Sequence, residues 1–106
     1  MQTVEHGVYR LILDERFPRI VRWEQMPSGA MLDGERRSAE PRLYVFRTTD
    51  RAVATTDNGT VAADYRLEVR AARAVYHGRV TWGGAPAAEF ALCIELQADD
   101  VVIRLQ

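Results

Sequence analysis

A run of alternating apolar and polar residues constrains this chain more than any other feature of its sequence. From position 88 to position 96 every second residue is apolar: Ala88, Phe90, Leu92, Ile94 and Leu96. The residues between them include Glu89, Cys93 and Glu95. Successive side chains of a strand point to opposite sides, so strict alternation is typical of a strand with one buried face. We therefore predict a half-buried strand here, with the apolar set inward.

Similar alternation on both sides predicts a four-stranded antiparallel meander over residues 65–105. Residues 65–70 alternate without a fault, and one parity of residues 74–82 carries Ala74, Tyr76, Gly78, Val80 and Trp82. Gly83-Gly84-Ala85-Pro86 and residues 97–100 are typical turn segments. Val101, Ile103 and Leu105 then continue the apolar face.

Residues 60–76 also fit a helix, because Val61, Tyr65, Val69, Ala72 and Tyr76 are spaced like one helical face. We favour strand, since clean alternation resumes directly after this stretch. A glycine inside a helix would also cost about 1 kcal/mol relative to alanine, which argues against a helix running on through Gly78. The alternative fold is α+β, a sheet packed on one helix around residues 60–76.

The N-terminal part shows shorter strand patterns separated by turn residues. They cover Val8 to Leu13, Ile20 to Met26, Met31-Leu32, Leu43 to Thr48 and Ala52 to Thr56. Residues 35–41 predict an exposed loop, and Asn58-Gly59 is the strongest two-residue hairpin signal. An open sheet would leave one apolar face wet, so a sandwich or a barrel is expected. We predict an all-β, antiparallel β-sandwich formed by residues 1–106 as a single domain.

The overall charge argues against two classes of partner. The net charge is −1, and all 14 basic residues are arginine. A near-neutral chain gives no general attraction to phosphate, so we expect neither a nucleic-acid nor a membrane partner. No apolar run approaches the ~20 residues of a membrane span. Residues 1–6 lack the features of a signal peptide.

Few residues in the sequence are suited to catalysis. Two histidines and one cysteine are too few for a zinc site, and no nucleophile elbow, phosphate loop or dinucleotide fingerprint is present. We therefore predict no catalytic residues, no metal and no cofactor. Among the aromatics, Tyr76 and Trp82 lie on an apolar parity and are expected in the core. Trp23 and Tyr44 remain as rings that could stack on a sugar.

Two neighbouring segments resemble a known family. Phe17-Pro18-Arg19-Ile20-Val21-Arg22-Trp23 is followed by Ser28-Gly29-Ala30-Met31-Leu32-Asp33-Gly34. This succession resembles the N-terminal, galactose-mutarotase-like β-sandwich region of endo-α-N-acetylgalactosaminidase-type glycoside hydrolases. That family has tyrosine where this chain has Trp23, and a valine-type residue where it has Ile20. The strands from Tyr76 to Leu105 are similar to the following strands of that region.

The resemblance implies a noncatalytic accessory domain of a carbohydrate-active enzyme, which scaffolds a catalytic domain or binds glycan. The implied partners are a glycan or an adjacent catalytic domain, the implied location is extracellular, and the chain would be a fragment of a larger protein. The predicted ligand-binding residues are Trp23, Tyr44 and Arg22, whose guanidinium suits sugar hydroxyls or carboxylates. The alternatives are a freestanding protein-interaction module, with self-association into a homo-oligomer, and a small β-barrel ligand-binding protein.

Overall fold

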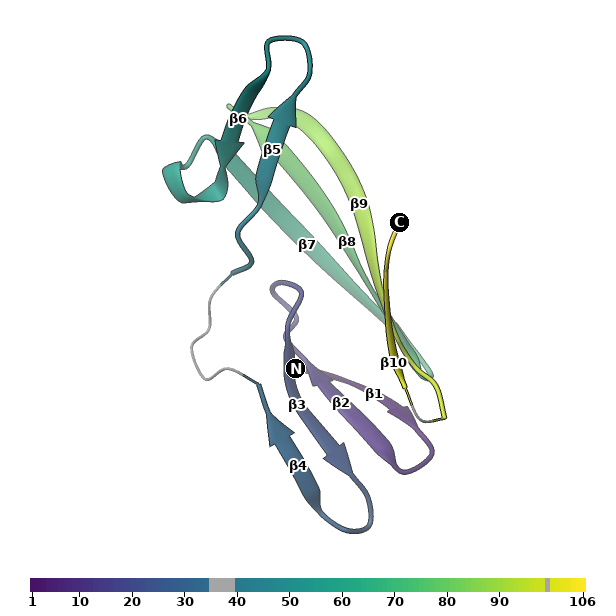
Figure 1. Cartoon of the computed structure of the whole chain (residues 1–106). Coiled ribbons are helices and arrows are strands. Elements are labelled where there is room, and N and C mark those ends of the chain that lie inside the picture. The colour runs from purple at the N-terminus through teal and green to yellow at the C-terminus, as the bar shows by residue number, and fades with distance from the viewer. Residues whose placement is uncertain (35–39, 99) are drawn as a thin grey trace.

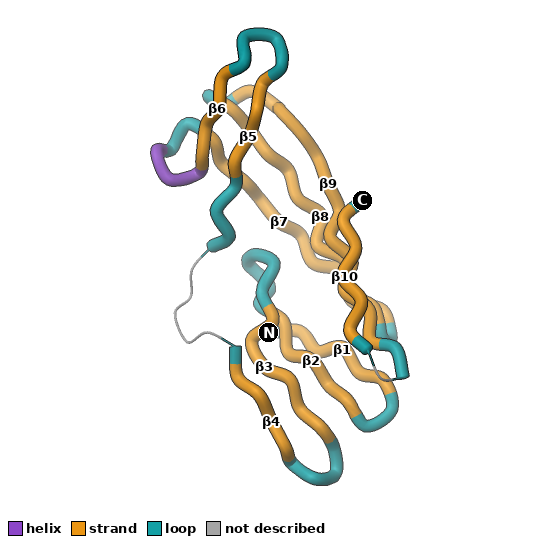
Figure 2. Tube along the Cα trace, viewed as in Figure 1, coloured by secondary structure: helices purple, strands orange, loops and turns teal. Residues whose placement is uncertain are grey.

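A computed structural model describes residues 1–34, 40–98 and 100–106 of the chain. These residues form ten strands, in which every pair is antiparallel, and one short 3₁₀ helix (Figures 1 and 2). The protein is therefore all-β, as predicted. None of the helical structure in this described part is long and apolar enough to cross a membrane. Most of the predicted loop at 35–41 lies outside the described residues.

The first four strands form the N-terminal sheet, in the order β1-β2-β3-β4. Its members are β1 (Gln2–His6), β2 (Tyr9–Leu13), β3 (Ile20–Gln25) and β4 (Ala30–Asp33). Three of these strands match the sequence prediction. The first strand was not predicted, because Val4 is its only large apolar residue and the stretch gives almost no alternation.

The last four strands form the C-terminal sheet, in the order β10-β9-β8-β7. Its members are β7 (Val61–Arg70), β8 (Arg73–Trp82), β9 (Ala85–Leu96) and β10 (Val101–Leu105). This is the predicted antiparallel meander, and the helical alternative for residues 60–76 is wrong. Continuous pairing from Val61↔Trp82 to Arg70↔Arg73 supplies the hydrogen bonds that a helix would have made internally.

A separate hairpin, β5 (Tyr44–Arg47) and β6 (Ala52–Thr55), is followed by the 3₁₀ helix η1 (Thr56–Asn58). The hairpin predicted at Asn58-Gly59 is wrong. Gly59 has a positive φ of 76° and ends η1, and the chain then enters β7. Since β7 pairs with β8 and not with β6, this glycine joins two different sheets.

The two four-stranded sheets pack face to face through a first core, which we call the N-terminal core. Its buried residues are Val4, Leu11 and Leu13 from the N-terminal sheet and Ala74, Tyr76, Ile94 and Leu96 from the C-terminal sheet. We call the face of the C-terminal sheet that carries these side chains its inner face. Packing of two antiparallel sheets through their apolar faces is the predicted β-sandwich.

The other half of the same inner face supports the β5–β6 hairpin through a second core, the hairpin core. It consists of Ala54, Val61 and Val80, with Val45 and Phe90 packed against it. The long strands β7, β8 and β9 thus run past both layers (Figure 1). The molecule is elongated in consequence, with extents of 53 × 26 × 19 Å and a radius of gyration of 15.9 Å. A compact chain of this length would have a radius of gyration of about 13 Å.

Two details of β9 differ from the predicted alternation. Ala88 is exposed, although it pairs with Val80 of β8, which is buried in the hairpin core. Cys93 lies opposite the apolar set, as predicted, yet it is buried. The side chain of Arg73 lies over the thiol, with its Nε 3.1 Å from Sγ.

Candidate functional site

Trp23 lies on the inward side of the N-terminal sheet. It pairs with Leu11, which is fully buried, and its ring packs against the N-terminal core. The ring also meets Tyr9 edge-to-face, with centroids 5.7 Å apart. Its remaining surface lines a shallow depression beside Met31 and Leu32. Trp23 is therefore half-buried and held mainly by core contacts.

Arg22, the preceding residue, points to the opposite side of β3, because consecutive strand residues alternate. Its Nε lies 2.6 Å from Oδ1 of Asp33, and its Nη1 lies 3.7 Å from Oε1 of Glu24. The hydrogen bond to Asp33 raises the pKa of the guanidinium. The group is thus already bound by carboxylates of its own sheet.

Tyr44 lies in the β5–β6 hairpin, and its side chain is 66% exposed. A shallow depression beside it is lined by Arg42, Asp57 and Glu40, among others. Nε of Arg42 lies 2.8 Å from Oδ2 of Asp57. A hydrogen bond with Tyr44 and the charge of Asp57 raise the pKa of Arg42. An aromatic ring and a charged pair therefore meet at one exposed position.

The structure does not bring the three predicted ligand-binding residues together. Arg22 and Trp23 point to opposite faces of one sheet, while Tyr44 belongs to a different sheet. Alternation within the predicted strand already places Arg22 and Trp23 on opposite faces. The sequence gives no signal for the position of Tyr44 relative to them, because that position is set by which strands pair.

The outward side of the hairpin carries a cluster that sequence reasoning missed, which we call the hairpin platform: Tyr44, Phe46 and Val53. Phe46 pairs directly with Val53, and Tyr44 lies two residues before Phe46 on the same face. Phe46 is 58% exposed and Val53 is 63% exposed. The sequence signal was present in residues 43–46, where both parities are apolar although only one face of the hairpin is covered.

The hairpin that carries the platform is fixed from its other side. Val45 and Ala54 pack into the hairpin core. The guanidinium carbon of Arg47 lies 4.3 Å from the ring centroid of Trp82, a cation–π contact, and Asp50 binds the same guanidinium at 2.6 Å. The platform is therefore an apolar surface on a supported backbone.

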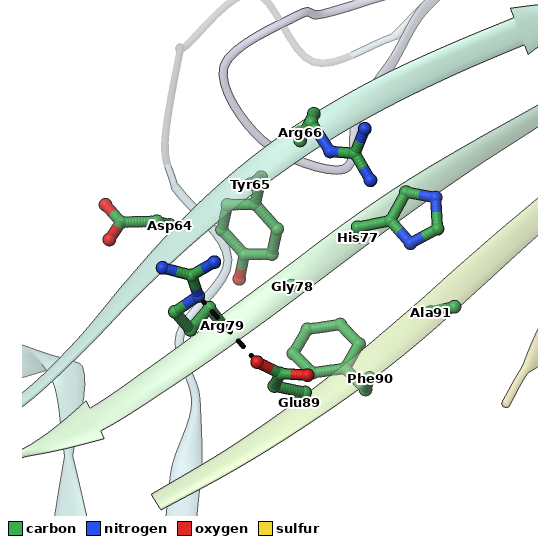
Figure 3. A pocket seen from close by; sticks show the side chains of 9 residues that line it. All are labelled: Asp64, Tyr65, Arg66, His77, Gly78, Arg79, Glu89, Phe90 and Ala91. Carbon is green, nitrogen blue, oxygen red and sulfur yellow. Dashed lines mark ion pairs between the residues drawn. The ribbon is translucent and has the colours of Figure 1, made fainter. Parts of the chain in front are cut away.

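The outer face of the C-terminal sheet is charged. Figure 3 shows Asp64, Arg66, His77, Arg79 and Glu89, which come from three neighbouring strands and line a shallow depression. Most of these charges are paired locally: Arg79 Nε lies 3.9 Å from Glu89 Oε1. Glu68 lies 3.0 Å from Arg66 and 3.4 Å from His77, which lower the pKa of its carboxyl.

In the middle of the inner face, Gly78 makes room for an aromatic pair. Gly78 pairs with Tyr65 of β7 on one side and with Phe90 of β9 on the other. The rings of Tyr65 and Phe90 meet edge-to-face, with centroids 6.1 Å apart. A Cβ at position 78 would lie 2.4 Å from Cζ of Phe90. The glycine therefore serves packing.

Metal-ligating residues do not gather in the described ranges: no group of three or more His, Cys, Asp or Glu side chains is placed to hold an ion. Comparison of the chain with protein-family models, with curated proteins and with solved structures gave no significant match.

Proposed function

We propose that this chain is a noncatalytic binding module that holds a partner protein on the hairpin platform. The observation that carries the proposal is the exposure of Tyr44, Phe46 and Val53 on one face of a hairpin whose opposite face is packed. Contiguous exposed apolar side chains of this size are typical of interaction sites.

The physics of interfaces supports the same choice. Large aromatic side chains at the centre of a contact usually carry most of the binding energy. The hairpin core and the stacking of Arg47 on Trp82 hold the platform backbone in place. Binding then costs little ordering entropy, which favours affinity.

The test is site-specific photo-crosslinking in the source cells, with a photoreactive residue at Phe46 and, as control, at Arg79 on the charged outer face. We expect a protein that crosslinks from position 46 only. The purified partner should then bind Val53→Asp at least about tenfold more weakly than the wild type. Absence of a position-specific partner, or equal affinity for Val53→Asp, would overturn the proposal.

A second candidate function is glycan binding by a domain accessory to a carbohydrate-active enzyme. One observation favours it: the exposed ring of Tyr44 lies beside the Arg42–Asp57 ion pair. An aromatic face can pack on the C–H groups of a sugar, while a charged pair supplies donors and acceptors for its hydroxyls.

The two candidate functions can be distinguished by the residues that each of them requires. Titration with galactose- and N-acetylgalactosamine-containing oligosaccharides, followed by amide chemical shifts, should perturb residues 42–44 and 56–57 if glycan binds. Tyr44→Ala should abolish those shifts, while Val53→Asp should leave them unchanged. Shifts that persist in Tyr44→Ala, or no shifts at millimolar sugar, would rule out the glycan site.

A further inference from the structure

Strand β10 forms one edge of the C-terminal sheet and is separate from the strands that carry the hairpin platform. Strand β10 is the last strand in the order β10-β9-β8-β7, and no described strand pairs with its other side. Figure 1 shows β10 along the margin of the molecule, with β9 on one side only. An unpaired strand edge is a template for pairing with another strand.

Backbone hydrogen bonds decide which residues of β10 present their polar groups to the free edge. Gln106 exchanges hydrogen bonds with Ala91 in both directions, at 2.8 and 3.1 Å, and Gln97 N–H donates to the Asp100 carbonyl. Residues whose backbone groups bond to the neighbouring strand alternate along an antiparallel strand. The even-numbered residues 100–106 therefore direct their N–H and C=O groups toward β9. Val101, Ile103 and Leu105 therefore direct their N–H and C=O groups outward.

The same three residues carry apolar side chains. Ile103 is 56% exposed and Leu105 is 72% exposed. Natural edge strands are commonly protected by proline, by lysine or by inward-pointing charges. Strand β10 has no proline, and its one charged residue, Arg104, points to the opposite face. This edge thus combines free backbone groups with uncovered apolar side chains.

We propose that β10 pairs antiparallel with β10 of a second copy of this chain, about a two-fold axis at Ile103. In this register Ile103 faces Ile103 of the second copy, and Val101 faces Leu105. All three positions are then hydrogen-bonded pairs, which gives six backbone hydrogen bonds in the ideal ladder. The two C-terminal sheets become one continuous eight-stranded sheet.

Charge complementarity favours a second copy over an unrelated strand. Arg104 and Asp100 lie on the same face of β10. Neither forms an ion pair with another residue of the described ranges. In the proposed register Arg104 lies diagonal to Asp100 of the second copy, within reach of a long side chain, and the symmetry makes this contact twice. An isologous contact occupies the β10 edge of both copies, so this contact closes as a dimer and does not propagate into a fibre.

The first experiment tests the register by cross-linking. Paired hydrogen-bonded residues have Cα atoms about 5.5 Å apart, which a disulfide can span. Ile103→Cys should therefore oxidise to a covalent dimer on a non-reducing gel. Leu105→Cys is the matched control, because in this register its two copies lie about 13 Å apart. The native Cys93 is buried and should not react.

The second experiment tests the charge contact by sedimentation across the micromolar to millimolar range. The wild type should dimerise reversibly. Arg104→Asp and Asp100→Arg should each weaken the dimer several-fold by placing like charges together, and the double variant should restore it. Leu32→Lys, at an exposed apolar residue of the other sheet, should leave it unchanged. Circular dichroism should show each variant folded.

Three results would overturn the inference. A wild type that stays monomeric throughout the range has no such interface. Equal cross-linking by Ile103→Cys and Leu105→Cys would exclude the register, and a double variant no stronger than the single variants would exclude the ion pair. Val53→Asp separates this inference from the proposed function, because it should reduce partner binding and leave the dimer intact.

Discussion

Tyr76 links two distant parts of the chain through a single atom. Its side chain is fully buried in the N-terminal core, and its hydroxyl donates to the backbone carbonyl of Asp14 at 2.6 Å. Asp14 begins the turn between β2 and β3, and its carboxylate accepts hydrogen bonds from the backbone and guanidinium of Arg16. Sequence alternation predicted that Tyr76 is buried, but not this hydrogen bond, because its partner lies 62 residues away.

We expect Tyr76→Phe to destabilise the protein by about 1–3 kcal/mol, since it leaves a buried carbonyl without its donor. Urea unfolding at neutral pH measures this change. Tyr44→Phe is the matched control, and its exposed ring should change stability by less than about 0.5 kcal/mol. Equal effects of the two substitutions would contradict the role of the Tyr76 hydrogen bond.

The buried phenol of Tyr76 also predicts that the stability of the protein changes at alkaline pH. Burial raises the pKa of Tyr76 from 10.0 to about 12. Above pH 10 the unfolded chain loses this proton while the folded chain keeps it, so the free energy of unfolding falls as the pH rises toward 12. Unfolding measured across this range should decline less steeply for Tyr76→Phe than for the wild type. Parallel declines would show that this phenol does not contribute.

Asp14 predicts the opposite dependence on pH. The hydrogen bond from Arg16 holds the pKa of its carboxyl below 3.8 in the folded state. Its stabilising contribution is therefore present above pH 3.8 and is lost as the pH falls through the folded-state value. Asp14→Asn should cost about 1–3 kcal/mol at neutral pH, and this difference should shrink in acid. Asp33→Asn, at an exposed ion pair, should cost less than about 1 kcal/mol.

At the scale of strands, local pattern predicted most elements and failed where pairing is not local. The alternation in residues 65–105 reports a real buried face, so the four-stranded meander could be predicted. Asn58-Gly59 has the chemistry of a tight hairpin, yet the strands on either side of it pair elsewhere. Turn chemistry specifies a local backbone shape, and it does not specify the strand partners.

Gly78 offers a test of packing within the C-terminal sheet. Gly78→Ala should destabilise by about 1–3 kcal/mol, because the new Cβ would displace the ring of Phe90. Phe90→Ala removes that ring, so the further loss caused by Gly78→Ala should nearly vanish in the Phe90→Ala background. Urea unfolding of the four proteins closes the double-mutant cycle. Equal costs in both backgrounds would show that the ring does not limit this position.

Across the whole molecule, the division into three sheets explains why the candidate site could be predicted only in part. Trp23, Arg22 and Tyr44 each have the side chain that sugar recognition would need. Alternation alone separates Arg22 from Trp23, whereas the position of Tyr44 depends on long-range strand pairing, which alternation does not encode. The hairpin platform likewise becomes visible only once one face of β5–β6 is known to be covered.

Two cores on one sheet predict how substitutions combine. Leu11→Ala in the N-terminal core and Val80→Ala in the hairpin core share no described core neighbour, so their unfolding free energies should add within about 0.5 kcal/mol. Leu11→Ala with Ile94→Ala, both in the N-terminal core, should deviate from additivity by more. Strong coupling between the first pair would mean that the sheet transmits packing changes along its length.

The N-terminal core also has a consequence for synthesis on the ribosome. Val4, Leu11 and Leu13 emerge early, while the residues that cover them, Ala74, Tyr76, Ile94 and Leu96, are translated roughly sixty or more residues later. At about 5–20 residues per second, the nascent N-terminal sheet waits roughly three to twelve seconds without its partner layer. During that interval its apolar face is available to chaperones or to neighbouring nascent chains, and the yield of folded protein should depend on the speed of translation.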